Sequence, residues 1–224
     1  MEDLYFRQIP VGPMSNFAYA IGSLSTRECV LVDPAWEVRA LLDQLDEDGM
    51  TLTGALVTHY HPDHCGGSMY GFAAEGLPEL MKLRPVPVHV NEHEAEGLRR
   101  VTGLSASDLT RRASGDRVVV GGVELTFLHT PGHTPGSQCF LVGDRLVSGD
   151  TLFLQGCGRV DLPGGDAAAM YESLTQRLSA LPDDTILYPG HLYSPEPHAP
   201  LRDVRRTNYA LLVPTLKDWL RMMG

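Results

Sequence analysis

The sequence has no excess of basic residues and no long apolar run, and these absences exclude several classes of protein. Its 224 residues carry a formal net charge of −10 at pH 7, which argues against binding to nucleic acid or to an anionic membrane surface. No apolar stretch approaches the roughly 20 residues of a transmembrane helix. The acidic start of the chain lacks the basic and apolar regions of a secretory signal. We therefore expect a cytoplasmic protein with neither a nucleic-acid nor a membrane partner.

Cysteine is also scarce, and its spacing argues against a disulfide or zinc-ribbon framework. The chain has four cysteines, and none of them belongs to a Cys-x-x-Cys pair. Without a secretory signal, such cysteines are expected to be reduced thiols. The composition is 43% hydrophobic, which suffices for a large core in a chain of this length. We expect one domain over residues 1–224.

Apolar runs separated by glycine- and proline-rich turns predict a protein rich in strands. Strands are expected at residues 4–10, 17–21, 29–33, 52–57, 86–90, 117–120, 123–129, 138–142, 145–148 and 185–188. Helical periodicity predicts helices at about 36–48, after Asp166, and from about residue 214 with Leu216, Trp219 and Leu220 facing inward. Between them, residues 68–114 are predicted to be a mostly helical insertion with the single strand at 86–90.

Residues 58–67, Thr-His-Tyr-His-Pro-Asp-His-Cys-Gly-Gly, place three imidazoles and one carboxylate within six residues at the end of a predicted strand. His59 and His61 point to the same side if the chain is still extended there. The proline that follows bends the backbone, so that Asp63 and His64 can face a second point nearby. Imidazole and carboxylate ligands suit zinc, iron or manganese. The stretch therefore predicts a metal site.

Other candidate metal ligands stand near the ends of later strands. His133 lies in a loop that two Pro-Gly pairs make rigid, and Asp150 and His191 each follow a predicted strand. Asp33 also ends a strand, either as a plain turn residue or as an acceptor that orients a metal-bound histidine. A site built from loops at one edge of stacked sheets is typical of metal hydrolases.

With these motifs in this order, the sequence resembles the metallo-β-lactamase superfamily, and within it the branch of glyoxalase II (hydroxyacylglutathione hydrolase) and persulfide dioxygenase. The resemblance runs over about residues 7–208. It implies an α+β protein with the αβ/βα four-layer sandwich of that family, in which two mixed sheets pack together and helices lie outside.

The resemblance also implies two divalent metal ions, with zinc expected and iron or manganese as alternatives. Seven residues match the family's ligands: His59, His61 and His133 for the first ion, Asp63, His64 and His191 for the second, and Asp150 as the bridge. Asp63 and Asp150 would be the catalytic carboxylates. His129 does not match the family pattern and is expected to be a non-ligand. His89 and His93 lack the His-Glu-x-x-His spacing of a zinc helix and are expected to be surface or packing residues.

Two positions resemble the glutathione contacts of glyoxalase II. The stretch Gly-Cys-Gly-Arg ends at Arg159, and Tyr193 stands two residues after the last ligand histidine. The resemblance implies a small-molecule partner, a conjugate of glutathione or another thiol. The alternatives are a salt bridge between Arg159 and Asp161, and simple packing of Tyr193. No oligomeric state is predicted.

Two activities are compatible with this ligand set. The favoured one is a glyoxalase II-like hydrolase whose binuclear site activates water to cleave a thioester. The alternative is a mononuclear iron persulfide dioxygenase acting on glutathione persulfide, with His59, His133 and Asp150 as iron ligands. The Arg-Val-Asp pattern at residues 159–161 and the lack of the longer C-terminal extension of glyoxalase II are closer to the dioxygenase branch. β-Lactamase activity is not expected, because true β-lactamases of this fold lack a bridging aspartate.

Overall fold

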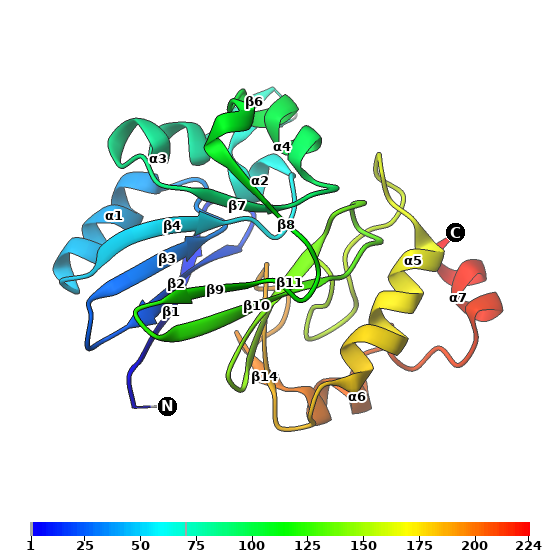
Figure 1. Ribbon diagram of the computed structural model, residues 1–224. Helices are drawn as coiled ribbons and strands as arrows, with labels where there is room; N and C mark the ends of the chain where they lie inside the picture. Colours follow the sequence, from blue (N-terminus) through cyan, green and yellow to red (C-terminus); the bar gives the residue numbers. More distant parts are fainter. Residues whose placement is uncertain (1, 70) are drawn as a thin grey trace.

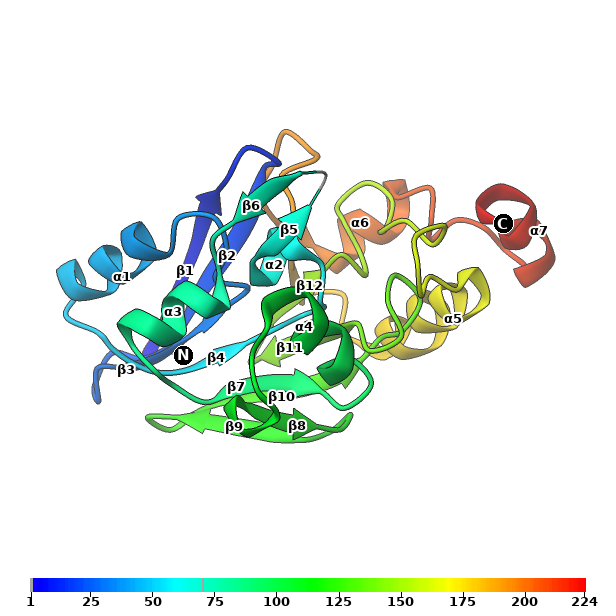
Figure 2. The same ribbon diagram turned by 90° about the horizontal axis from the view of Figure 1, so that it is seen from above.

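The structure is a computed structural model that describes residues 2–69 and 71–224. Within that part, two six-stranded sheets pack face to face (Figures 1 and 2). The first sheet has the order β1 (Leu4–Val11), β2 (Asn16–Ser23), β3 (Glu28–Val32), β4 (Thr51–Leu56), β7 (Val88–Asn91) and β8 (Leu109–Arg112). The second has the order β14 (Ala199–Pro200), β13 (Ile186–Pro189), β12 (Arg145–Gly149), β11 (Gln138–Val142), β10 (Val123–His129) and β9 (Arg117–Val120). A separate hairpin joins β5 (Gly67–Met69) and β6 (Phe72–Ala74).

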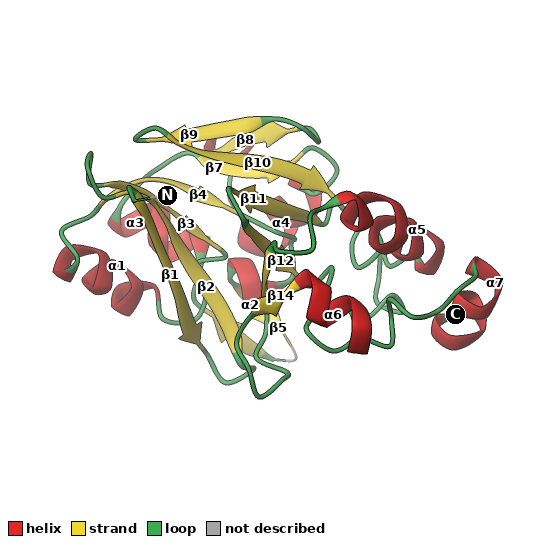
Figure 3. Ribbon diagram, turned by 90° about the horizontal axis from the view of Figure 1, so that it is seen from below, coloured by secondary structure: helices red, strands yellow, loops and turns green. Residues whose placement is uncertain are grey.

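Helices lie outside the two sheets, and each group covers one of them (Figure 3). The first sheet is covered by α1 (Val38–Glu47), α2 (Pro62–Cys65), α3 (Leu77–Leu83) and α4 (Ala95–Thr102). The second is covered by α5 (Ala167–Glu172), α6 (Leu201–Thr207) and α7 (Leu216–Met223). Irregular helical turns occupy Ala106–Asp108, Ser173–Arg177 and Leu178–Ala180. Asp166 caps α5 by accepting a hydrogen bond from the Ala169 N–H at 2.9 Å.

Three apolar layers separate the sheets and helices, because successive side chains of a strand point to opposite faces. Tyr19 of β2 lies in the layer between the sheets, whereas its neighbour Ala20 lies in the layer beneath α1 and α3. In the second sheet, Val147 lies between the sheets and Leu146 packs with the cluster that contains Trp219 of α7. Strands buried on both faces between two helical layers confirm the predicted α+β fold and four-layer αβ/βα sandwich.

Residues 68–114 differ from the prediction of a mostly helical insertion, which is wrong. Besides α3 and α4, the described part of this segment contains the strands β5, β6, β7 and β8 instead of one strand. β8 has the sequence Leu-Thr-Arg-Arg, with only one apolar residue, so its own pattern gives no strand signal. It forms by pairing in parallel with β7 at the edge of the first sheet, where a polar strand is stabilised by its partner's backbone.

The C-terminal helices also differ from the sequence prediction. α6 was not predicted, and α7 begins at Leu216 after the N-cap Thr215. Trp219 is fully buried as expected, but Leu216 and Leu220 are 41% and 42% exposed rather than inward. The four cysteines are buried and form no disulfide in the structure. Within the described residues, no helix has both the length and the apolar character to cross a membrane.

One edge of the sandwich gathers the ends of strands from both sheets. β3, β4, β12 and β13 end there, and β2, which runs antiparallel to β3, begins there. The two sheets are joined at this edge by a backbone bridge between Asn16 and His191. The Phe17 N–H donates to the Gly190 carbonyl at 2.8 Å. Side chains that follow these strands are therefore held close together.

Candidate metal centre

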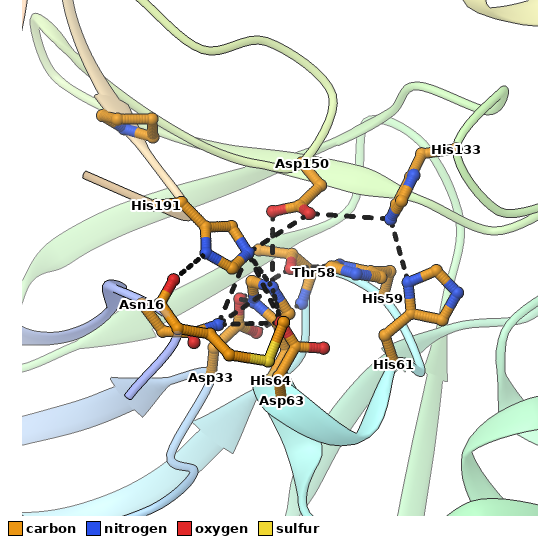
Figure 4. A network of polar contacts seen from close by, with 12 residues as sticks. Asn16, Asp33, Thr58, His59, His61, Asp63, His64, His133, Asp150 and His191 are labelled. Atoms are coloured by element: carbon orange, nitrogen blue, oxygen red, sulfur yellow. Dashed lines mark hydrogen bonds and ion pairs between the residues drawn. The ribbon is translucent and has the colours of Figure 1, made fainter. Parts of the chain in front are cut away.

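All seven predicted ligands meet at this edge, in the cluster of polar side chains that Figure 4 shows. They form three overlapping groups in which the ligand atoms lie within 4.8 Å of one another. The groups are His59 with His61 and His133, His59 with His64 and Asp150, and Asp63 with His64 and His191. The first and third groups are called the first trio and the second trio below.

Two imidazoles of the first trio, those of His59 and His133, are oriented by hydrogen bonds on their outer nitrogens. His133 Nδ1 lies 2.7 Å from the Arg159 carbonyl oxygen, which can only accept, so Nδ1 carries the proton and the lone pair is on Nε2. That Nε2 points inward and lies 2.9 Å from His61 Nδ1. Gly158 lies against this ring, because a Cβ there would be 2.8 Å from His133 Nδ1.

His59 is oriented through Thr58 and Asp33. The Thr58 hydroxyl donates to Asp33 Oδ2 at 2.6 Å and therefore accepts from His59 Nδ1 at 3.0 Å. This leaves the lone pair of His59 on Nε2, which is buried and has no hydrogen-bond partner. Asp33 itself is buried and takes a left-handed backbone conformation with φ 51°, which is unusual for a residue other than glycine.

In the second trio, two lone pairs face each other. His64 Nδ1 donates to Asp33 Oδ2 at 3.0 Å, and His191 Nδ1 donates to the Met14 carbonyl at 3.0 Å. When both rings are neutral, their Nε2 atoms thus turn lone pairs inward, 3.2 Å apart. Asp63 Oδ2 lies 3.4 Å from each of them. Such an arrangement of lone pairs and negative charge is repulsive unless a cation lies among the three atoms.

Asp150 lies between the two trios. Its Oδ1 is 3.3 Å from His64 Nε2, and its Oδ2 is 3.4 Å from His191 Nε2 and 3.6 Å from His133 Nε2. The side chain is 11% exposed, and its buried Oδ1 has no hydrogen-bond partner. A carboxylate that reaches both trios has the geometry of a bridge.

The pKa values of the histidines differ between the first trio and the second trio. Burial, with neighbouring imidazoles, lowers the pKa of His59 well below its ordinary value and that of His61 to about 4. Burial also acts to lower the pKa of His64 and His191, but carboxylates dominate: Asp63 and Asp150 raise the pKa of His64 well above its ordinary value, and Asp150 raises that of His191 to about 9. The second trio therefore attracts positive charge, as a cation site does.

These observations fit a site for divalent metal ions. The cluster supplies buried nitrogen and oxygen atoms with converging lone pairs and no thiolate, a ligand set that suits zinc, iron or manganese. The unpartnered atoms His59 Nε2 and Asp150 Oδ1 are acceptors that a metal ion would satisfy. His59, His64, His133 and His191 are also each held by an acceptor on the other ring nitrogen, as metal-ligating histidines commonly are.

A cavity of about 660 Å³ opens onto the cluster. Tyr193 lines it and stacks on His191, with ring centroids 4.6 Å apart and an interplanar angle of 12°. Phe153 adds an edge-on ring 5.2 Å from Tyr193. Arg159 also lines the cavity, and its exposed guanidinium forms an ion pair with Asp161 at 2.7 Å, which is the alternative considered for it from the sequence.

The remaining histidines discussed from the sequence lie outside the three groups. His129 Nε2 donates to the Pro135 carbonyl at 2.9 Å. His89 is buried, and burial, with the Arg112 guanidinium, lowers its pKa to about 4. His93 has a largely exposed side chain.

Glu94 was not predicted from the sequence, although its side chain connects the two loops that carry the ligands of the first trio. Glu94 is fully buried. Its Oε1 accepts from the Tyr60 N–H at 2.8 Å and the Thr134 hydroxyl at 2.6 Å, and its Oε2 accepts from the Gly136 N–H at 2.7 Å. Tyr60 stands between two predicted ligands and Thr134 follows another. No spacing in the sequence marks this glutamate, which precedes α4 as an ordinary acidic residue would.

Asn16 was also missed, and only the structure brings it to the cluster. It opens β2, is 1% exposed, and donates from Nδ2 to Asp63 Oδ2 at 3.0 Å. It lies 47 positions before Asp63 in the chain. A single asparagine at the start of a strand gives no signal of a metal site by itself.

Most of this chain matches known proteins in sequence and in fold. The family profile described as "Metallo-beta-lactamase superfamily" matches residues 11–191. The chain is 33% identical to a hydroxyacylglutathione hydrolase of Shewanella halifaxensis, covering 90% of this chain and 71% of that protein. It is 31% identical to the human mitochondrial persulfide dioxygenase ETHE1, covering 93% and 76%. The crystal structure of ETHE1 from Myxococcus xanthus has a TM-score of 0.83 and 32% identity, covering 98% and 89%.

Proposed function

The chain belongs to the metallo-β-lactamase superfamily, and on this premise we propose that it is a glyoxalase II-like hydrolase that cleaves a thioester of glutathione or of a similar thiol. The observation that carries the proposal is the second trio. Its three ligand atoms lie 3.2–3.4 Å from one another, and the outer nitrogens of its two histidines are already held by acceptors. A single-metal enzyme has no need of such a site.

The proposed ligands are the seven residues of the cluster, with two divalent ions and zinc as the expected metal. Bound there, the ions would supply Lewis acidity and a water of lowered pKa. The Asp150 carboxylate, which reaches both trios, would accept a hydrogen bond from the attacking water and aim it at the thioester carbonyl. Asp63 would help to hold the second ion in place. Because a thiolate leaves readily, the site needs no strong general acid.

The cavity suits a substrate of this kind. Its volume of about 660 Å³ lies within the usual range of small-molecule sites. We assign the glutathione-like part to the wall that contains Arg159 and Tyr193. There the guanidinium would exchange its exposed partner Asp161 for a substrate carboxylate, and the aromatic ring would cover the backbone of the peptide-like thiol.

The second candidate is a mononuclear iron persulfide dioxygenase. The similarity to human ETHE1, at 31% identity, supports it as strongly as 33% identity to the hydroxyacylglutathione hydrolase supports the first candidate. In that case His59, His133 and Asp150 would hold iron. The second trio would then remain as a structural group without a metal.

The two candidates differ in their use of dioxygen. We expect the purified enzyme, reconstituted with zinc, to hydrolyse S-lactoylglutathione at the same rate with and without air. The products are measured as free thiol released. His64→Ala is the matched variant, because it removes a second-trio ligand and leaves the first trio complete, and it should lose most of this activity. Oxygen uptake with glutathione persulfide, together with no thioester cleavage, would overturn the proposal.

A further inference from the structure

The buried amide of Asn16 lies against every ligand atom of the second trio (Figure 4). Its Nδ2 is 3.0 Å from Asp63 Oδ2, 3.4 Å from His64 Nε2 and 3.5 Å from His191 Nε2. The side chain is 1% exposed, and its Oδ1 has no hydrogen-bond partner. Asn16 is the first residue of β2, and its backbone is held in place by the bridge to the backbone of His191.

These four atoms have the spacing of ligands around one ion, to which the bridging Asp150 would add a fifth ligand. The three trio atoms form a triangle with sides of 3.2, 3.4 and 3.4 Å, and the Asn16 amide atom caps it with edges of 3.0, 3.4 and 3.5 Å. Together they form a nearly regular tetrahedron. The centre of such a tetrahedron lies about 2 Å from each corner, which is the length of a zinc–nitrogen or zinc–oxygen bond.

The chemistry of a carboxamide decides which of its atoms faces a cation. In the orientation described here, the Nδ2 group donates to the Asp63 carboxylate. An N–H pointing at a metal ion would be repelled, whereas the amide oxygen is an acceptor that divalent ions bind. The oxygen and nitrogen ends have nearly the same shape, so a half-turn about the last side-chain bond exchanges them within the same space. In either orientation one of the two amide atoms lacks a hydrogen-bond partner. A cation among the trio atoms would therefore favour the turned form, because that form places the oxygen toward the cation.

We propose that Asn16 is a further ligand of the second metal ion, through Oδ1, and that it favours two ions over one. The inference rests on the binuclear site of the proposed function and adds a residue that is not among the seven predicted ligands. It also assigns a specificity role: a chain with this amide stabilises the second ion needed for hydrolysis. Asn16 thus bears on which of the two candidate activities the site performs.

The test is the metal content of Asn16 variants, measured without any substrate. Metal-free protein is loaded with zinc, dialysed, and analysed for zinc per chain; the affinity of each site is then measured by competition with a chelating dye. Wild-type protein should hold two ions. Asn16→Ala should keep the first ion and bind the second at least about tenfold more weakly. Asn16→Asp, whose carboxylate can occupy the same position, should restore two ions.

Gln138→Ala is the matched control. Gln138 is also a buried amide whose oxygen lacks a partner, but its Nε2 donates to the Val57 backbone carbonyl rather than to a ligand. It should retain two ions. Thermal unfolding of each metal-free variant checks that the fold is intact. If Asn16→Ala fails to fold, the zinc content and affinities of Asn16→Asp are compared with those of the wild type instead.

Three outcomes overturn the inference: wild-type protein that binds only one ion, Asn16→Ala that binds two with unchanged affinities, or Asn16→Asp that binds only one. Failure of the proposed function is a separate result. If wild-type protein holds two ions through Asn16 and yet cleaves no thioester, the role of Asn16 stands and the assigned reaction is wrong.

Discussion

Replacing Glu94 tests whether the metal loops are held by a residue that touches no metal. The carboxylate accepts three hydrogen bonds, from the Tyr60 N–H, the Thr134 hydroxyl and the Gly136 N–H. Glu94→Gln has the same shape, but its NH₂ end must face at least one of these donors. A buried donor left without a partner costs about 1–3 kcal/mol. We therefore expect the free energy of unfolding of the metal-free protein to fall by that amount.

The same change should weaken metal binding, because Tyr60 and Thr134 stand beside ligands of the first trio. Loss of a group that orients ligands commonly lowers metal affinity by about 10- to 100-fold. Urea unfolding measures the first effect, and zinc competition with a chelating dye measures the second. Glu124→Gln is the control, since Glu124 is exposed in an ion pair with Arg117 and its replacement should change stability by less than about 0.5 kcal/mol. If Glu94→Gln unfolds and binds zinc as wild type does, the reasoning is refuted.

Four further predictions concern single residues. Asp150→Ala should abolish nearly all hydrolysis and lower the zinc content measured per chain. His129→Ala should leave zinc content unchanged, and a loss of zinc would contradict its placement outside the cluster. Arg159→Ala should raise KM about ten- to a hundredfold with little change in kcat, whereas an unchanged KM with lower stability would indicate a structural ion pair. Burial, with Arg112, lowers the pKa of His89 from 6.5 to about 4. The folded protein therefore keeps its full stability above pH 6.5 and loses part of it as the pH falls toward 4, because only the unfolded chain binds the proton readily in that range. Between pH 7 and 5, wild-type protein should lose about 2 kcal/mol that His89→Gln retains, as urea unfolding at both pH values would measure.

The parts of the site that are local in sequence could be predicted from it. His59 to His64 lie in the short loop and helix α2 that follow β4, so their spacing and the strand before them indicate a common target. The continuous apolar runs of β2 and β12 likewise predict strands buried on both faces, whereas the four-layer sandwich was implied by the resemblance to the family.

The parts that depend on the packing of distant elements could not be predicted. Asn16 reaches Asp63 only because β2 pairs with the backbone beside β13, and no local pattern encodes that register. Glu94 acquires its role from burial between two loops. The polar strand β8 forms only because β7 offers a free edge, which explains why its segment was predicted to be helical.

The measurement that tests the central claim most directly is a titration of metal-free enzyme with zinc, followed by thioester hydrolysis under nitrogen. The account predicts that the rate is low after the first equivalent and rises mainly with the second, because both trios and Asp150 must be occupied. Full hydrolytic activity at one equivalent would contradict the binuclear account. So would an enzyme that stays inactive at two equivalents and instead consumes dioxygen when one iron per chain is supplied with glutathione persulfide.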